Sequence, residues 1–164
     1  FYHWAWILAP APIARRFFAG LYCLYAVGFL GYSLMPASGP WVHLAPTFLS
    51  PLQGGPVTWL THRLVEAGCN GVDVFPSLHC AVAAYLLGFD FLNGHRGRCV
   101  AWMAPGIGLC LATVYLRYHY AVDVMAGLIL AVVALALAGR SNPEATLVPM
   151  PGIHAEIVRA LNPA

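Results

Sequence analysis

The sequence contains few charged residues and no lysine at all. Charged side chains make up 9% of the 164 residues, whereas a soluble domain usually carries about a quarter. Hydrophobic residues make up 60% of the chain, more apolar surface than a core of this size can hide. A lipid bilayer is the environment that accepts such a surface. The net charge of +2 and the lack of a long cationic run argue against a nucleic acid partner.

The five cysteines form no C-x-x-C pair, which argues against a structural zinc site or a dithiol redox motif. The apolar stretch at residues 1–9 is too short to be read as a signal peptide with a basic leader and a cleavage site. We interpret this stretch as the end of a preceding membrane helix. The domain is therefore expected to be truncated at its N-terminus.

Four apolar stretches are long enough to cross about 30 Å of hydrocarbon, which takes roughly 20 helical residues. They cover residues 17–35, 76–92, 99–116 and 120–139. We therefore predict an all-α fold, a bundle of four full transmembrane helices plus the end of a preceding one. Residues 1–139 are expected to form this domain, and residues 140–164 a cytoplasmic tail.

Arginines in the short connections predict the orientation. They precede the first stretch, separate the second from the third and follow the fourth: Arg15, Arg16, Arg96, Arg98 and Arg140. Short basic loops stay on the cytoplasmic side of a membrane. All three basic segments can lie on that side, because an even number of spans separates each one from the next. Residues 35–75 and 117–119 are then expected on the outer face. Apolar residues at helical spacing in residues 57–67 predict a short helix on the membrane surface.

Two ionisable residues, His119 and Asp123, open the fourth stretch. A spacing of four places two side chains on one helical face, about 5–6 Å apart at Cβ. The carboxylate could then accept a hydrogen bond from one imidazole nitrogen and leave the other free as a base or nucleophile. Ionisable groups in membrane spans are costly, which favours a function. A structural pair that anchors the helix at the headgroups explains the pattern equally well.

A second polar group opens the second stretch. Pro76 suits the first turn of a helix, and the free N–H groups beside Ser77 could bind an anion. His79 could donate a proton to a leaving oxygen, although an interfacial histidine without a role is the simpler interpretation of this residue alone. Arg117 and Arg63 lie in the outer segments, where a guanidinium could hold phosphate oxygens or contact lipid headgroups.

These segments resemble the type 2 phosphatidic acid phosphatase superfamily, which also includes the vanadium haloperoxidases. The Pro-Ser-Gly-His block of that superfamily is similar to Pro76-Ser77-Leu78-His79. The His…Asp half of its third block is similar to His119-x-x-x-Asp123. The resemblance covers residues 17–139, with both blocks in the expected order and on the same predicted side of the membrane.

Three departures from the superfamily pattern are specific. No Lys…Arg-Pro block precedes Pro76, Leu78 replaces the glycine, and Ala112-Thr113 stands where Ser-Arg is expected. These features resemble the branch that contains inositol phosphorylceramide synthases. Members of that branch transfer a phospho-headgroup to another lipid, and not only to water.

The resemblance implies an integral membrane phosphatase or phosphotransferase of the inner or plasma membrane, with an extracytoplasmic site. It implies that His119 attacks phosphorus, that Asp123 orients it, and that His79 protonates the leaving alcohol. In place of the cations missing from the family pattern, we expect Ser77, Arg117 and Arg63 to hold the phosphate. No metal or other cofactor is implied, and the expected partners are a lipid phosphate substrate and membrane lipids.

Several alternatives stay open at this point. Two histidines and one aspartate also resemble a facial metal triad. A structural or transport bundle with interfacial His–Asp pairs would need no chemistry. Phosphatidic acid, undecaprenyl diphosphate, phosphatidylglycerol phosphate and phosphoinositides all fit the expected site as substrates. Hydrolysis and transfer to an acceptor are equally compatible with the motifs.

Overall fold

The computed structural model describes residues 2–48, 54–68 and 71–140. Regular structure within these ranges is helical, apart from one isolated bridge between Ala37 and Asp73. The elements are α1 (Tyr2–Ile7), α2 (Ala11–Leu34), α3 (Pro40–His43), a 3₁₀ turn (Ala45–Thr47), α4 (Pro56–Gly68), α5 (Leu78–Leu92), α6 (Arg96–Tyr115) and α7 (Ala121–Arg140). The predicted all-α fold is confirmed, as is a helix over the predicted segment 57–67. The expected tail beyond Arg140 lies outside the described residues.

Within the described residues, three helices and not four are long and apolar enough to span a membrane: α2, α6 and α7. The predicted second span is wrong in length, because α5 has only 15 residues. At 1.5 Å per residue it is about 22 Å long, short of a hydrocarbon core of about 30 Å. Pro76 and Ser77 stay outside the helix, since the Ser77 Oγ caps it by accepting from the Cys80 N–H at 3.5 Å. The other end stops before Gly94, which has a φ of +80°.

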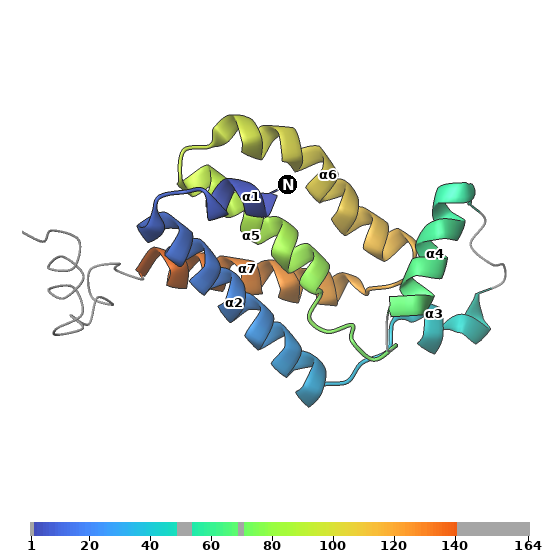
Figure 1. Ribbon diagram of the computed structural model, residues 1–164. Helices are drawn as coiled ribbons and strands as arrows, with labels where there is room; N and C mark the ends of the chain where they lie inside the picture. The colour runs from blue at the N-terminus through green and yellow to red at the C-terminus, as the bar shows by residue number, and fades with distance from the viewer. Residues whose placement is uncertain (1, 49–53, 69–70, 141–164) are drawn as a thin grey trace, which may run out of the picture.

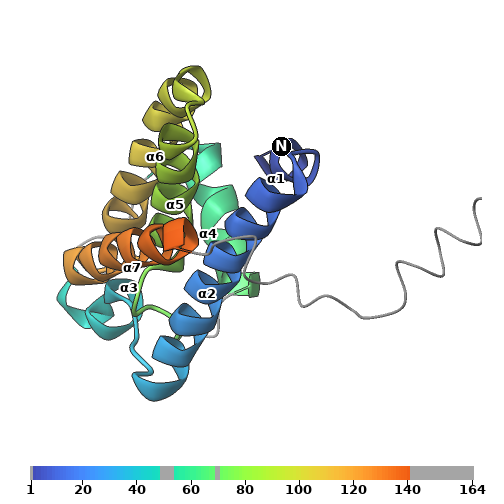
Figure 2. The same ribbon diagram turned by 90° about the vertical axis from the view of Figure 1, so that its left-hand side faces the viewer.

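The short helix α5 lies at the centre of the bundle, with α2, α6 and α7 packed around it (Figures 1 and 2). Tyr85 is fully buried, and its Oη donates to the carbonyl oxygen of Phe17 at 2.8 Å. A Cβ at Gly20 would lie 2.3 Å from the same Oη, so only glycine allows α2 to approach this closely. A helix enclosed in this way need not reach both membrane surfaces.

The outward faces of the three long helices carry large exposed apolar side chains. Examples are Tyr22, Phe29, Val100, Leu111, Ile129 and Val132. Exposed apolar surface of this extent is unfavourable in water and is matched by lipid. The chain is therefore a membrane protein.

The two ends of the bundle differ in their chemistry. In Figure 1 the start of α2, the end of α5, the start of α6 and the end of α7 lie toward the left. At that end Asp90 is fully buried, and Arg98 donates from Nε to its Oδ2 at 2.7 Å and from Nη2 to its Oδ1. The Arg98 guanidinium also lies 4.7 Å from the centroid of the Trp6 ring. The opposite end carries α3, α4 and the motif residues.

Candidate active site

The structure brings His79, His119 and Asp123 together from three separate segments. His79 lies in the first turn of α5, and Asp123 lies in the first turn of α7. His119 lies in the connection between α6 and α7. The two imidazole centroids are 5.8 Å apart with an interplanar angle of 61°. The Nδ1 of His119 lies 3.8 Å from the Oδ2 of Asp123.

Two details of the predicted His–Asp pair are wrong. His119 and Asp123 do not share a helix, because α7 begins only at Ala121. The carboxylate of Asp123 caps that helix instead, with its Oδ2 accepting from the Tyr120 N–H at 2.7 Å. The Nδ1 of His119 is buried and has no hydrogen-bond partner among the described residues. The pair is therefore in electrostatic contact without the expected hydrogen bond.

A tight turn after α6 places His119. The backbone N–H groups of Tyr118 and His119 both donate to the carbonyl oxygen of Thr113, at 3.0 and 3.1 Å. Arg117 reverses the chain with a φ of +64°, a left-handed conformation that non-glycine residues seldom adopt. Thr113 stands where the superfamily pattern has arginine. It contributes here through its backbone carbonyl oxygen, which accepts both hydrogen bonds of the turn.

Direct backbone contact holds the first turns of α5 and α7 together. The N–H of Ser77 donates to the carbonyl oxygen of Asp123 at 3.0 Å. A Cβ at Gly127, one turn further along α7, would lie only 2.3 Å from the carbonyl oxygen of Ser77. The spacing between His79 and the His119–Asp123 pair therefore depends on a glycine at this helix crossing.

Burial keeps the imidazole of His119 neutral. Its side chain is 5% exposed, and the loss of solvent is the largest cause that lowers its pKa. The neighbouring His79 lowers the pKa further, whereas the Val74 carbonyl and the Asp73 carboxylate act in the opposite direction. The resulting pKa is about 4. At neutral pH this imidazole is uncharged and has a nitrogen lone pair available for attack.

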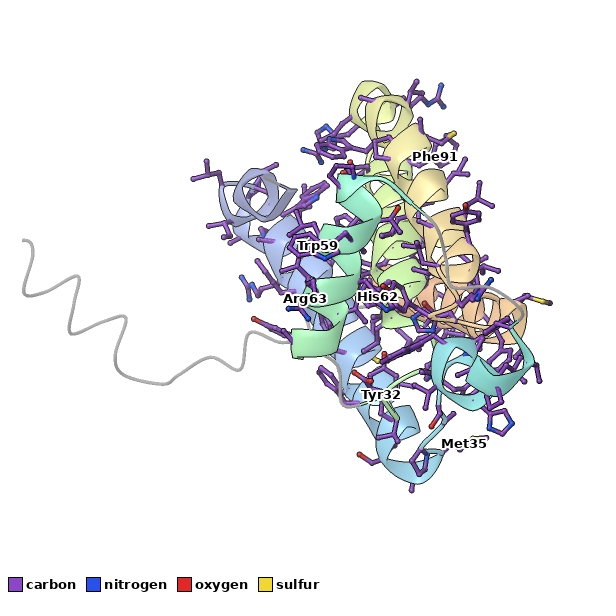
Figure 3. The ribbon with its side chains drawn as sticks, turned by 90° about the vertical axis from the view of Figure 1, so that its right-hand side faces the viewer. Tyr32, Met35, Trp59, His62, Arg63 and Phe91 are labelled. Carbon is purple, nitrogen blue, oxygen red and sulfur yellow. The ribbon has the colours of Figure 1, made fainter. Side chains whose placement is uncertain are left out.

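Two connected hollows meet at His79. A cavity of about 180 Å³ lies on the His119 side and includes Asp73, Trp41 and Tyr118 in its lining. A groove of about 640 Å³ runs between α2, α5 and α6 and is mainly apolar. The residues common to both are Tyr32, Asp73, His79 and Leu109. Figure 3 shows Tyr32 near the end of α2, with α4 crossing this end of the bundle.

The three predicted phosphate-binding residues are not gathered around the histidines. Ser77 is fully buried as the cap of α5. The guanidinium of Arg117 lies 3.7 Å from the centroid of the Phe48 ring, and Arg63 is an exposed residue of α4 (Figure 3). None of the three lines the cavity or the groove.

Asp73 lines both hollows but was not among the residues predicted from the sequence. Asp73 is bridged to Ala37, and the Ala37 N–H donates to the Val72 carbonyl oxygen at 3.1 Å. Two features of the sequence could have pointed to Asp73. It lies three residues before Pro76, and the only other acidic residue in the segment 35–75 is Glu66. Nothing local to that loop indicates that Asp73 reaches the histidines.

The described residues also bear on a metal site. Within these residues, no group of three or more histidine, cysteine, aspartate or glutamate side chains lies close enough to hold a metal ion. The facial triad considered above therefore has no ligand cluster in this part of the chain.

Comparison with known proteins gives one finding. A family model described as the PAP2 superfamily matches residues 1–137, which include both histidines and Asp123. No match was found among curated proteins or among solved structures.

Proposed function

This chain belongs to the PAP2 superfamily, and we propose that it transfers phosphoryl groups of lipid phosphates through a phosphohistidine on His119. Members of this superfamily are phosphatases and phosphotransferases that act on lipid phosphate substrates. The observation that carries the proposal is the neutral, buried imidazole of His119 facing His79 at 5.8 Å beside an apolar groove.

The first step forms the covalent intermediate. The mechanism places the ring proton of His119 on Nδ1, which faces Asp123 at 3.8 Å, and the lone pair on Nε2. This nitrogen attacks phosphorus, the bond from phosphorus to the leaving oxygen breaks, and His79 gives its proton to that oxygen. The positive charge that develops on His119 is stabilised by Asp123, whose Oδ2 lies 3.8 Å from Nδ1.

The second step returns the enzyme to its starting state. His79, now neutral, removes the proton of an incoming hydroxyl. The oxygen of that hydroxyl forms a bond to phosphorus as the bond from phosphorus to Nε2 breaks. Water as the acceptor gives hydrolysis, and a lipid alcohol gives transfer, as in the inositol phosphorylceramide synthase branch that the sequence resembles.

The groove supports a substrate with a lipid tail. Tyr25, Phe29, Leu86, Leu87 and Trp102 are among the residues that line it, and they come from α2, α5 and α6. Its volume of about 640 Å³ lies in the range of ligand pockets, roughly 300–1,000 Å³. A tail in this groove places the headgroup beside His79. The arginines at the start of α2, at the start of α6 and at the end of α7 lie at the opposite end of the bundle (Figure 1). Arginines of this kind favour the cytoplasmic side, which supports an extracytoplasmic position for the site.

Phosphate binding by Ser77, Arg117 and Arg63 stays a prediction, and it requires both guanidinium groups to leave their present positions. The free N–H groups in the first turn of α5 are nearer donors, because His79 lies in that same turn. Ser77 contributes by holding this turn against α7.

The test is phosphohistidine trapping with a panel of lipid phosphates, with and without acceptor alcohols. His119→Ala should abolish both the trapped intermediate and turnover, whereas His43→Ala, an exposed residue of α3, should change neither. Activity inhibited by vanadate and insensitive to chelators separates this mechanism from a metal-dependent one. Turnover retained in His119→Ala would contradict the proposal, and no turnover on any lipid phosphate would favour a non-enzymatic bundle.

A further inference from the structure

The cavity beside the two histidines combines a carboxylate with aromatic rings and has no guanidinium in its lining. Its lining includes Asp73, Tyr32, Trp41, Tyr118, His79 and His119. The chain contains no lysine, and neither the cavity nor the groove is lined by an arginine. The described site therefore offers no permanent positive charge to a bound phosphate.

This charge pattern discriminates between classes of phosphate ester. A phosphomonoester carries up to two negative charges and is normally bound by arginine, lysine or a metal ion. Asp73 would repel such a group. A phosphodiester carries one negative charge, and an ammonium group in the same headgroup makes the whole headgroup neutral. An ammonium is attracted both to a carboxylate and to the faces of tryptophan and tyrosine rings.

On the basis of the function proposed above, we propose that the substrate is a lipid phosphodiester whose headgroup ends in an ammonium, of the phosphocholine or phosphoethanolamine type. Asp73, Trp41 and Tyr118 hold the ammonium in the smaller cavity. The lipid tails occupy the groove. The phosphorus then lies between the two hollows, beside His79 and His119.

The aromatic wall of the cavity is built by segments far apart in the sequence. The Trp41 N–H donates to the carbonyl oxygen of Arg117 at 2.9 Å, which ties α3 to the turn before His119. A Cβ at Gly39 would lie 2.4 Å from the Tyr118 carbonyl oxygen, so glycine permits this contact. The Tyr118 hydroxyl makes a hydrogen bond of 3.0 Å with the Nδ1 of His62 on α4. The first two contacts fix the backbone at Trp41 and Tyr118, and the hydrogen bond with His62 fixes the ring of Tyr118 before a ligand binds.

The position of His79 decides which ester bond breaks. Because His79 lines both hollows, it lies beside the oxygen that joins the phosphorus to the lipid in the groove. The Nε2 of His119 bonds to phosphorus, the bond to the lipid oxygen breaks, and His79 protonates that oxygen to release diacylglycerol. The amino-alcohol phosphate stays on His119. An acceptor hydroxyl then gives its proton to His79 and displaces the Nε2, taking the phosphorus group.

The experiment compares four lipids with identical acyl chains and the full chain in detergent. They are phosphatidylcholine, phosphatidylethanolamine, phosphatidylglycerol and phosphatidic acid. Phosphatidylglycerol is the matched control, since it is a phosphodiester without an ammonium. The rate of phosphohistidine formation should give a kcat/KM at least tenfold higher for the two ammonium lipids than for phosphatidylglycerol or phosphatidic acid.

Two variants test the residues that hold the ammonium. Asp73→Asn should lower kcat/KM for the ammonium lipids about tenfold, mainly through KM, and should not lower it for phosphatidylglycerol, because the carboxylate that repels an anion is gone. Trp41→Leu keeps an apolar side chain but removes the ring. It should likewise lower kcat/KM for the ammonium lipids more than for phosphatidylglycerol. Equal losses for all lipids would mean a purely structural role and would overturn the assignment of these residues.

The relative kcat/KM of the unmodified chain for the four lipids decides the substrate class. Phosphatidic acid used faster than both ammonium lipids, with His119→Ala inactive, would overturn the ammonium proposal and leave the phosphohistidine mechanism standing. Turnover that persists in His119→Ala would instead overturn the mechanism. Absence of a phosphohistidine with all four lipids would overturn both.

Discussion

Replacing Gly127 by alanine should move His79 and Asp123 apart without changing either side chain. The new Cβ would lie 2.3 Å from the carbonyl oxygen of Ser77 and 3.3 Å from the N–H nitrogen of Ala81. Both are backbone atoms of the start of α5, so no side chain can rotate away to make room. Ordinary contact begins at 3.4 Å, and α7 must therefore shift by about 1 Å from α5. Asp123 lies one turn earlier on the same helix and shifts with it.

The size of the effect follows from this displacement. Overpacking of a helix interface costs about 1–3 kcal/mol of stability, so Gly127→Ala should still fold. Displacement of a catalytic group by about 1 Å can reduce the rate on the order of 100-fold. The hydrogen bond from the Ser77 N–H to the Asp123 carbonyl oxygen, now 3.0 Å, should lengthen at the same time. We therefore expect phosphohistidine formation to slow about 100-fold, with only a modest fall in melting temperature.

The assay is rapid-quench measurement of phosphohistidine, alongside thermal unfolding in detergent. Gly139→Ala is the matched control on the same helix, because its Cβ would meet no atom within 4 Å. It should leave both the rate and the melting temperature unchanged. A folded Gly127→Ala variant with a rate within threefold of the unmodified chain would refute the reasoning. The α5–α7 contact would then not set the distance between the histidines.

Three further predictions follow from the charges. Unit charges 3.8 Å apart interact by about 4 kcal/mol at an effective dielectric constant of about 20. Asp123→Asn should therefore slow phosphohistidine formation by up to about 1,000-fold. A loss under tenfold would mean that Asp123 acts only as a helix cap. Protonation removes the lone pair of His119, whose pKa is about 4, so the loss of rate of this step at acid pH should have its midpoint near pH 4. A midpoint near 6.5, the ordinary value, would contradict the burial argument. Arg98→Met leaves the fully buried Asp90 unpaired and should cost about 3–5 kcal/mol of stability. Asp90→Asn should cost less, because the Arg98 side chain is 26% exposed and can reach water, and thermal unfolding of the two variants checks this order.

The length of α5 shows where the local pattern of hydropathy is insufficient. Residues 76–92 are apolar enough to indicate a span, but hydropathy does not show that Ser77 caps the helix from outside. Nor does it show that α2, α6 and α7 enclose α5. An enclosed helix is selected for contact with its neighbours and not for the thickness of the bilayer, so its length departs from the transmembrane rule.

The arginines show a similar limit. Arg117 is two residues from His119, which made it a natural candidate for binding phosphate. Its φ of +64° directs the side chain onto Phe48, far from it in the sequence. Asp73, which no motif contains, reaches the site because its segment pairs with Ala37. Chain direction after a turn depends on such long-range contacts, and sequence spacing does not encode it.

Local features of the sequence indicated the membrane class and the all-α fold, and they singled out His79, His119 and Asp123 as candidate site residues. Hydropathy and residue spacing are local properties, and they can be read without knowing how helices pack. Which charged and aromatic side chains surround those residues became apparent only from the way the helices pack. That packing turned Arg117 outward, brought Asp73 and two aromatic rings inward, and buried the imidazole of His119. Burial and charge at a site depend on which distant segments surround it, and that is settled only when the helices pack.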